Sequence, residues 1–411
     1  MKMPFYPADI LLIKNAPFEK WSVVACDQYT SEPEYWQRVE KIVGDYPSCL
    51  KITLPEIYLN DKNVQDRIEN INKNMDKLLE ENAFEEYKNS FFYIERTQND
   101  GKVRKGLIGA VDLEQYSYEK GSQSQIRATE GTVLERIPPR VAVRKNASLE
   151  APHIMLLIDD REKSVIESIA PSSDTVYDFE LMEKGGKIKG YALNKEECEK
   201  VSKALDLLAE KAFEKNENPL LIAVGDGNHS LATAKACYEA LKKTTEPEYY
   251  LNHPARFALC ELVNLHSEAL EFEPIHRVIF KVDGDNFLKE MKNEFEICAQ
   301  NEATQSFEIL YKNKLEKIFI KNPPCDLAAG TVQQFIDKYI ENNGGEVDYI
   351  HGEDTVEKLC QQENSIGILL PCLDKNELFD KVISNGALPR KTFSMGHSYD
   401  KRFYLECRKI K

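Results

Sequence analysis

One stretch, residues 220–241, constrains the fold more than any other part of the chain. It reads LLIAVGDGNHSLATAKACYEAL, so a short apolar run (220–224) meets a Gly-Asp-Gly turn. Glycines permit a tight turn and close approach of a ligand to the backbone. Apolar residues then recur three or four positions apart, as on one face of a helix: Leu231, Ala234, Tyr238 and Leu241. The pattern predicts a buried strand, a turn and a helix.

Polar side chains gather at this turn. Asp226, Asn228, His229 and Ser230 lie around Gly227 within five positions. The start of a helix offers backbone N–H groups and a positive dipole end, which suits an anion. A carboxylate, an amide, an imidazole and a hydroxyl supply a base, a donor, a titratable group and a nucleophile. The same residues are also ordinary helix caps and turn formers.

Composition narrows the class of protein. The 411 residues allow two or three domains, and a net charge of −15 opposes a nucleic-acid surface, so no nucleic-acid partner is expected. No apolar run approaches the roughly 20 residues of a membrane span, and we expect no membrane association. The ten cysteines form no CxxC pair, and we expect no secretory segment at the start of the chain. Both features favour a reduced, cytoplasmic protein.

Strand and helix patterns alternate without a strict βαβ rhythm, which favours an α+β fold: a mixed β-sheet core with flanking helices. Strands are expected at 21–26 and 50–54, and a hairpin at 91–96 and 103–111 around an Asn-Asp-Gly turn. Asn194 is a plausible cap for a helix over 195–215. We expect a main α+β domain over 1–282 that carries the turn, and a smaller α/β region over 283–411 packed on it.

Further candidates lie at other strand ends. Asp27 follows the apolar run 21–26, although it could be a simple turn residue. The segment 126–145 is rich in cations, which suits phosphate or carboxylate recognition, unless its arginines pair with nearby glutamates. Because loops at strand ends converge, we expect one pocket to contain these residues: Asp27, Arg127, Glu130, Asp226, His229, His276 and Arg277. The pair His276–Arg277 could instead pin a sheet edge.

Several enzyme classes are excluded by missing motifs. The chain has no GxxxxGK[ST], no GxGxxG after a strand, no HExxH and no GxSxG. Its seven histidines do not pair at metal-ligand spacing, so we assign no metal ligands and expect no dedicated zinc site. Mg²⁺ needs only one or two carboxylates together with phosphate oxygens, and it stays open as a cofactor.

The turn also carries a family resemblance. GDGNHSLATAKA resembles the ADGHHRYATA signature of the SerC-associated uncharacterised family, domain of unknown function 1015. Further elements agree in order: SVVACDQY, ITLPE, ATEGTVLERIPPR, APHIMLLIDD, EPIHRVI and LPRKTF. The resemblance covers nearly the whole chain. One departure matters, because Asn228-His229-Ser230 stands where the family often has His-His-Arg. The family's arginine at the turn is absent here, and Arg127, Arg136 or Arg277 could supply its guanidinium group instead.

That family looks related to ParB-like and free serine kinase proteins. The relation implies a ParB-like strand–turn–helix element and phosphoryl transfer to or from the hydroxyl of L-serine, with ATP, ADP or pyrophosphate as donor. Such a reaction depends on positioning and charge neutralisation. The carboxylate that takes the hydroxyl proton would be Asp226, with Asp27 or Glu130 as alternates, and His229 would donate to a phosphate oxygen. The expected binding residues are Gly227, Asn228, Ser230, Arg127, Thr129, Arg136, His276, Arg277 and Lys391.

Two other functions remain open from the residues. A ParB-like module could sense a nucleotide or an amino acid without turnover, and the missing arginine favours it a little. A phosphatase or another hydrolase could use the same anion-binding turn. In all three cases the expected partner is a small molecule.

Overall fold

The computed structural model describes residues 1–131 and 137–411. They form two compact units, each of which is described by itself. Unit 1 comprises Met1–Leu270, Phe379–Ala387 and Gly396–Lys411; unit 2 comprises Glu271–Leu378 and Leu388–Met395. This division differs from the expected one at 282/283. Unit 2 begins earlier because β15 (Phe272–Phe280) pairs with β18 (Glu346–His351) and β19 (Ser365–Leu369). The chain end belongs to unit 1 because β21 (Phe403–Tyr404) pairs with β3 (Val23–Val24).

Within the described residues, a ten-stranded sheet forms the centre of unit 1, in the order β11-β12-β5-β6-β14-β10-β13-β8-β7, with β1 beside β6. It is mixed: β10 runs parallel to β14, and β8 parallel to β13 and β7, whereas the other pairs are antiparallel. Its strands are β1 (Phe5–Tyr6), β5 (Phe92–Thr97), β6 (Val103–Asp112), β7 (Tyr116–Ser117), β8 (Ile126–Ala128), β10 (Met155–Ile158), β11 (Tyr177–Glu180), β12 (Lys187–Ala192), β13 (Ile222–Asp226) and β14 (Phe257–Asn264).

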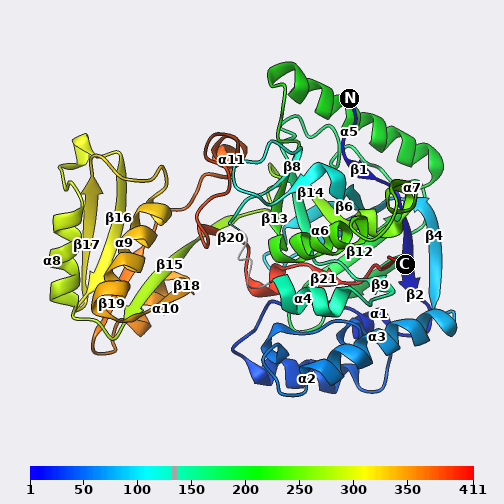
Figure 1. The fold of residues 1–411 in the computed structure, drawn as a ribbon, viewed down its shortest axis with the longest axis horizontal. Helices are drawn as coiled ribbons and strands as arrows, with labels where there is room; N and C mark the ends of the chain where they lie inside the picture. The colour runs from blue at the N-terminus through cyan, green and yellow to red at the C-terminus, as the bar shows by residue number, and fades with distance from the viewer. Residues whose placement is uncertain (132–136) are drawn as a thin grey trace. The chain divides into compact units, whose positions relative to one another are not determined.

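Helices cover both faces of this sheet, because successive strand residues point to opposite sides. Phe92 and Ile94 belong to one core with α2 (Pro33–Val43) and α3 (Val64–Glu80). Tyr93, between them, belongs to the other core with α5 (Lys195–Lys215) and α6 (Asn228–Lys242). Figure 1 shows α2 and α3 at one side of unit 1 and α5 at the other. The predicted mixed sheet with flanking helices is confirmed.

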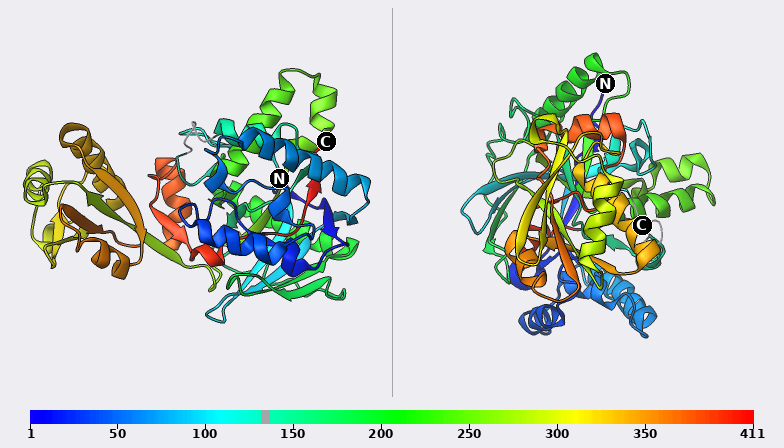
Figure 2. Two further views of the ribbon diagram at one scale, coloured as in Figure 1. Left: turned by 90° about the horizontal axis from the view of Figure 1, so that it is seen from below. Right: turned by 90° about the vertical axis from the view of Figure 1, so that its left-hand side faces the viewer.

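Smaller elements complete unit 1. Two further strand pairs are β2 (Ala8–Ile13) with β4 (Phe84–Ser90), and β9 (Leu149–Glu150) with β22 (Arg408–Lys409). Among the described residues, the remaining α-helices are α1 (Phe18–Trp21), α4 (Ile137–Arg144), α7 (Pro247–Asn252) and α11 (Leu378–Asn385), of which Leu378 alone belongs to unit 2. Both chain ends lie in unit 1, as the N and C marks in Figures 1 and 2 show.

The local predictions fared unequally. The hairpin is confirmed as β5 and β6, and Asn194 caps α5 with a capping box. In place of the strand expected at 21–26 the structure has the shorter strand β3, because Trp21 is the last residue of helix α1. The strand expected at 50–54 is wrong: a 3₁₀ turn, Cys49–Lys51, begins there, because the Ser48 hydroxyl accepts the Leu50 N–H and starts the turn.

Unit 2 is built on its own antiparallel sheet. Among the described residues this sheet has six strands, in the order β17-β16-β19-β15-β18, with β20 beside β15. The further strands are β16 (Gln305–Tyr311), β17 (Lys314–Ile320) and β20 (Phe393–Met395), and the helices are α8 (Gly284–Glu294), α9 (Ala328–Asn343) and α10 (Glu353–Leu359). Helices α8 and α9 meet through Phe287, Phe335 and Tyr339. Helix α10 contributes Val356 to a separate small core.

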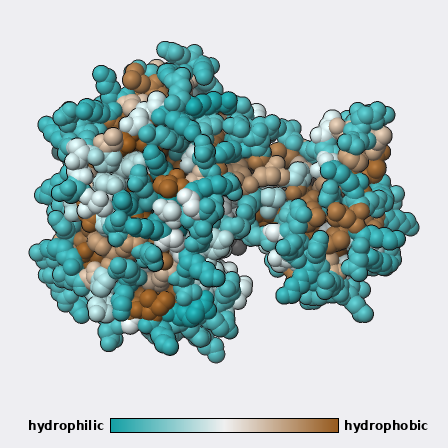
Figure 3. Space-filling model, turned by 180° about the vertical axis from the view of Figure 1, so that it is seen from behind, coloured by the Kyte–Doolittle hydropathy of each residue, from teal (hydrophilic) through white to brown (hydrophobic). Residues whose placement is uncertain are grey.

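Hydrophilic side chains cover much of the surface seen in Figure 3, with apolar side chains in smaller patches. Among the described residues, no helix combines the length and apolar character needed to span a bilayer.

Candidate functional site

The sheet topology of unit 1 brings three chain segments to one edge. Strands β8 and β13 run parallel, so both end there, at Ala128 and Asp226. Strand β10 runs antiparallel to β13 and starts at the same edge, where Met155 pairs with Asp226. The residues beyond these ends therefore come together: Thr129 and Glu130 after β8, Gly227 after β13, and His153 before β10.

The predicted strand–turn–helix is confirmed, and Gly227 makes the turn. Its φ of 79° lies in the left-handed region, and a Cβ there would stand 3.0 Å from Ile154, so glycine is the residue that fits. Helix α6 starts at Asn228, and the Leu231 N–H donates back to the Gly227 carbonyl at 3.0 Å. The N–H groups of residues 228–230 precede that first bond and have no acceptor within the helix. The turn thus presents donors at the positive end of α6.

A chain of hydrogen bonds crosses the site beside this turn. Ser230 Oγ lies 3.1 Å from His153 Nε2, and His153 Nδ1 lies 3.0 Å from the Tyr404 hydroxyl. The Cys26 backbone N–H donates to the same hydroxyl at 3.0 Å. The Asp27 carboxylate stands 3.9 Å from His153 Nε2 and accepts from the Gln28 amide at 3.1 Å. A carboxylate, an imidazole, a hydroxyl and a phenol therefore meet at the start of α6.

The electrostatics keep Asp27 ionised. Burial alone would raise the pKa of Asp27, but His153, the Gln28 amide and Lys401 together hold that pKa below its ordinary value of 3.8. The pKa values of the neighbouring thiol and phenol are raised, not lowered. Burial, with Asp27 adding to it, raises the pKa of the Cys26 thiol to about 12. Burial and the charges at Cys26 and Asp27 raise the pKa of the Tyr404 phenol well above its usual range. At neutral pH the Asp27 carboxylate is thus ionised, next to a protonated thiol and a protonated phenol.

Lys401 brings a cation to the turn. Its Nζ lies 3.4 Å from Asp226 Oδ2, with the side chain only 10% exposed. Asp226 Oδ1 accepts the Gly227 N–H at 2.8 Å. Because Lys401 also lowers the pKa of Asp27, its ammonium acts on both carboxylates of the site.

Buried arginines hold the segment that carries Lys401 and Tyr404. Arg96 of β5 donates to the carbonyls of Tyr399 and Lys401, at 2.8 and 3.3 Å. Arg104 of β6 donates to the Asp400 carbonyl at 2.9 Å. Arg402 bonds two buried carboxylates, Glu261 at 2.8 Å and Glu406 at 2.7 Å. The backbone of residues 399–402 is thereby fixed against the large sheet.

A cavity of about 140 Å³ opens beside the cluster. Cys26, His153, Ser230, Thr233 and Tyr404 line its polar end, and Leu54, Met75 and Leu149 belong to its apolar wall. Arg140 and Arg144 also line it, but they pair with Glu56 and Glu150 respectively. The cavity joins polar groups to an apolar wall, as expected for a small organic ligand.

Several predicted site residues come together at the turn, namely Asp27, Asp226, Gly227, Asn228, His229 and Ser230. The buried Asn228 Oδ1 has no hydrogen-bond partner among the described residues. The half-buried His229 sits in the first turn of α6, where its carbonyl accepts from Thr233 at 2.7 Å. Glu130 is half-buried two residues beyond β8.

Other predicted residues have structural partners or lie elsewhere. The Thr129 hydroxyl donates to the Val224 carbonyl at 2.6 Å. Arg127 donates to the carbonyls of Ser124 and Asn218, at 2.7 and 2.9 Å, so these donors hold a loop. Arg127 also lines a different, small hollow with Val382 and Gly386. Arg136 lies outside the described residues.

Three predicted binding residues belong to unit 2. His276 Nδ1 accepts the Leu370 N–H at 3.1 Å, and burial together with Arg277 lowers the pKa of His276. Arg277 is fully buried, donates to the Ile275 carbonyl and stands 5.2 Å from the Tyr349 ring centroid. Lys391 is exposed. These contacts are internal to unit 2, and the binding roles of the three residues stay predictions.

Three residues of the site were missed by sequence reasoning: His153, Lys401 and Tyr404. His153 had a usable signal, because it lies at the start of the apolar run 153–158, two residues before strand β10, and so at a sheet edge. Lys401 lies outside any helix or strand, Tyr404 lies in the two-residue strand β21, and neither has a periodic pattern around it. Their positions depend on the arginines of β5 and β6, hundreds of residues earlier.

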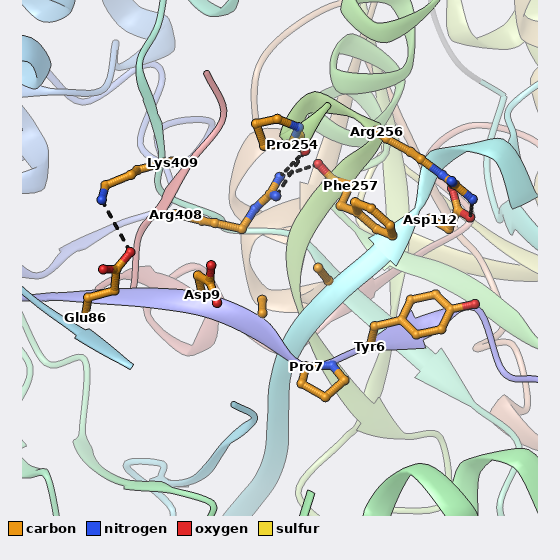
Figure 4. A pocket seen from close by; sticks show the side chains of 12 residues that line it. Tyr6, Pro7, Asp9, Glu86, Asp112, Pro254, Arg256, Phe257, Arg408 and Lys409 are labelled. Atoms are coloured by element: carbon orange, nitrogen blue, oxygen red, sulfur yellow. Dashed lines mark hydrogen bonds and ion pairs between the residues drawn. The ribbon is translucent and has the colours of Figure 1, made fainter. Parts of the chain in front are cut away.

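A second cavity in unit 1, of about 460 Å³, lies around Tyr6, Asp9 and Phe257 (Figure 4). Its cations have partners: Arg256 pairs with Asp112 at 2.5 Å, and Lys409 with Glu86 at 3.3 Å. Arg408 donates to the Pro254 carbonyl at 3.0 Å. Because these interactions already satisfy the cations, we do not assign the cavity to an anionic ligand.

The oxygen atoms at the turn can be compared with the needs of a cation. In the part of the chain that the structure describes, no group of three or more His, Cys, Asp or Glu side chains could hold a metal ion. Mg²⁺ bound to a phosphate needs fewer protein ligands. The Asp226 carboxylate and the buried Asn228 Oδ1, which has no partner among the described residues, are oxygen ligands of the required kind. Mg²⁺ as a cofactor stays a prediction.

Comparison with known proteins gives a family and distant structural likenesses. The model of the family described as "Protein of unknown function (DUF1015)" matches residues 11–339. No curated protein matches the chain. Among solved structures, a variant of a free serine kinase in complex with AMP is 11% identical, with a TM-score of 0.42, over 77% of this chain and 95% of that one.

Two other solved structures are similarly distant. A conserved hypothetical protein from Pyrococcus furiosus is 11% identical, with a TM-score of 0.38, over 75% of this chain and 96% of its own. SbnI with a C-terminal truncation, from Staphylococcus aureus, is 9% identical, with a TM-score of 0.38, over 70% of this chain and 82% of its own. Likenesses at this level carry no argument about activity.

Proposed function

The chain belongs to the DUF1015 family, and we propose that it is a small-molecule phosphotransferase. In this proposal a phosphoryl group passes between a nucleotide or pyrophosphate and the hydroxyl of a small amino acid, with L-serine as the first candidate. The observation that carries it is the ionised Asp27 carboxylate beside His153 and Ser230 at the start of α6, with the Lys401 ammonium near by. The choice of serine follows the family resemblance, which implies phosphoryl transfer to or from the hydroxyl of L-serine.

The groups of the site match the needs of phosphoryl transfer, which relies on positioning and charge neutralisation. Asp27 would accept the proton of the substrate hydroxyl while that oxygen forms a bond to phosphorus. The bond from phosphorus to the bridging oxygen of the donor breaks, and the donor leaves as its shortened phosphate. Lys401 and the N–H groups at the start of α6 would hold the phosphoryl oxygens.

Further residues have supporting roles in this proposal. Asp226 and Asn228 would hold Mg²⁺, which when bound neutralises phosphate charge. His229, in the first turn of α6, would donate to a phosphate oxygen. Nucleotide donors belong to the cytoplasm, the location that the unpaired cysteine pattern favours.

A hydrolase is the second candidate, on one specific observation. Ser230 Oγ lies within hydrogen-bond distance of His153 Nε2, with Asp27 close by. These residue types match those of a serine nucleophile activated by histidine. Such a site would release inorganic phosphate from phosphoserine with no nucleotide present.

Titration calorimetry followed by phosphorus NMR tests the proposal. The ligands are L-serine, phosphoserine, ATP, ADP and pyrophosphate, each with and without Mg²⁺. We expect phosphoserine to form from L-serine and one donor, and the rate to fall by about 100- to 10,000-fold in Asp27→Asn, because the base is lost. Asp45→Asn, an exposed carboxylate, is the matched control and should behave like the wild type.

The outcomes separate the three readings. Binding of serine or nucleotide without any transfer would contradict the proposal in favour of a sensing module. Phosphate release from phosphoserine alone would favour the hydrolase.

A further inference from the structure

The hydrogen bonds around His153 carry information about its protons. Tyr404, from strand β21, meets His153 Nδ1 at 3.0 Å, in a contact that is buried. On the other side of the ring, Nε2 faces Ser230 Oγ at 3.1 Å and the Asp27 carboxylate at 3.9 Å. Each ring nitrogen therefore has its own partners, and the donors and acceptors can be counted.

The phenol has one proton and can accept two hydrogen bonds. One acceptor position is used by the Cys26 backbone N–H, at 3.0 Å. The phenol keeps its proton, since burial and its neighbours raise the pKa of Tyr404 well above the usual range. The Cys26 thiol also stays protonated, since burial raises its pKa to about 12, and sulfur is only a weak acceptor.

A buried O–H needs an acceptor. Among the described residues, the nitrogen acceptor in contact with the Tyr404 hydroxyl is His153 Nδ1. If the phenol donates to Nδ1, the neutral imidazole carries its proton on Nε2. That proton points to Ser230 Oγ and the Asp27 carboxylate, both of which accept hydrogen bonds.

We infer that Tyr404 is a positioning residue that keeps the His153 proton on Nε2, so that His153 is a hydrogen-bond donor in the site and not the base that would activate Ser230. The catalytic part of this inference rests on the phosphotransferase function proposed above. There, His153 would donate to an oxygen of the transferred phosphoryl group or hold Ser230 in place.

The same arrangement argues against the serine hydrolase. In a Ser-His-Asp triad the carboxylate binds Nδ1–H and leaves Nε2 bare to take the serine proton. Here the carboxylate stands on the Nε2 side, and the Nδ1 side holds a phenol. Ser230 therefore accepts from His153, and its own proton is available to a ligand in the cavity.

The test reads the tautomer directly. The full chain is labelled with ¹⁵N-histidine, and nitrogen–proton correlation spectra at neutral pH report which ring nitrogen of His153 carries the proton. His153→Asn assigns the signal among the seven histidines. Tyr404→Phe removes only the hydroxyl. Tyr116→Phe is the matched control, because the buried Tyr116 hydroxyl has no hydrogen-bond partner among the described residues.

In the wild type we expect the proton on Nε2. In Tyr404→Phe we expect a second form with the proton on Nδ1, a kcat lower by about 10- to 100-fold and a nearly unchanged KM, because an orienting partner is lost. Tyr116→Phe should keep the wild-type tautomer and rate. A wild-type proton on Nδ1 overturns the inference, and so does a Tyr404→Phe variant with the wild-type tautomer, whatever its rate.

The wild-type spectrum, once assigned, needs no turnover. Failure of phosphoryl transfer in the assay above would therefore reject the proposed function while the tautomer result stands, and the reverse also holds.

Discussion

The site has two halves that reach it by different means. The turn at 226–230 is placed by local features: a buried strand before it, a left-handed glycine within it and a helix after it. The C-terminal segment, Gly396–Lys411, has only short strands and delivers Lys401 and Tyr404 through contacts with distant residues. One half is local and readable from sequence, whereas the other depends on the finished tertiary structure.

Buried charge explains how a segment with so little regular structure can be placed accurately. Arg402, 2% exposed, lies between Glu261 and Glu406, which are both fully buried. A buried ion pair gains little net stability, but removal of one partner is costly because a charge is left uncompensated. We propose that the network selects the register of the segment, since a slip of one residue would leave such charges unpaired.

The largest expected effect follows from that network. Arg402→Met should lower the free energy of unfolding by about 3–5 kcal/mol, because Glu261 and Glu406 lose a buried partner. Denaturant titration measures it. Lys409→Met is the control, since its pair with Glu86 is half-exposed and should contribute less than about 1 kcal/mol. Equal losses in the two variants would show that the segment is not held by buried charge.

His229 tests the local half. His229→Ala should leave stability within about 0.5 kcal/mol of the wild type, since the residue is not in the core. Its rate of phosphoryl transfer should fall by about 100- to 1000-fold, because a donor to the transition state is lost. Leu231→Ala is the matched control: Leu231 is fully buried, and the cavity should cost about 2–5 kcal/mol. A destabilised His229→Ala with wild-type turnover would make the histidine structural.

Lys401 tests the other half with a smaller effect. Lys401→Met should weaken binding of pyrophosphate by about 10- to 100-fold, or roughly 1.4–2.8 kcal/mol, because the cation at the turn is lost. Lys401→Arg keeps the charge and should recover much of the affinity. Lys120→Met, at an exposed lysine, is the control. Calorimetry gives the affinities, and a Lys401→Met variant that binds as the wild type would place the phosphate elsewhere.

The smallest effect is the pH dependence of Asp27. Its pKa is lower in the folded state than its ordinary value of 3.8, so the folded state binds its proton less readily than the unfolded chain. The stabilisation is therefore complete above about pH 4 and is lost as pH falls through the folded pKa. Denaturation curves of the wild type and Asp27→Asn should converge as pH drops from about 5 toward 3. A wild type that gains stability relative to Asp27→Asn as pH falls through that range would show that the pKa is raised instead.

The features that depend on neighbours in the chain could be predicted from the sequence. The strand–turn–helix, the hairpin of β5 and β6 and the Asn194 cap follow from periodicity, turn residues and capping. The strand expected at 50–54 was wrong because a serine side chain, Ser48, bonds the backbone and starts a 3₁₀ turn. A short apolar run in the sequence is compatible with a strand and with a helical turn, so the pattern alone does not tell them apart.

Long-range placement could not be predicted in the same way. The sequence gives no sign that Lys401 meets Asp226 or that Tyr404 meets His153, since those pairs depend on buried arginines and sheet order. The guanidinium group of Arg127 is suited to bind phosphate, but two of its N–H groups donate hydrogen bonds to loop carbonyls instead. A sequence pattern identifies candidate residues, but the three-dimensional fold determines which of them keep hydrogen-bond donors available for a ligand.

A double-mutant cycle on pyrophosphate binding tests most directly that the two halves form one site. The cycle uses Asp226→Asn, Lys401→Met and the double variant, with dissociation constants measured by calorimetry in the presence of Mg²⁺. Because Lys401 Nζ lies 3.4 Å from Asp226 Oδ2, we expect a coupling free energy of about 0.5–3 kcal/mol. Effects that add to within about 0.3 kcal/mol would contradict it, because they would mean that the turn and the C-terminal segment act independently.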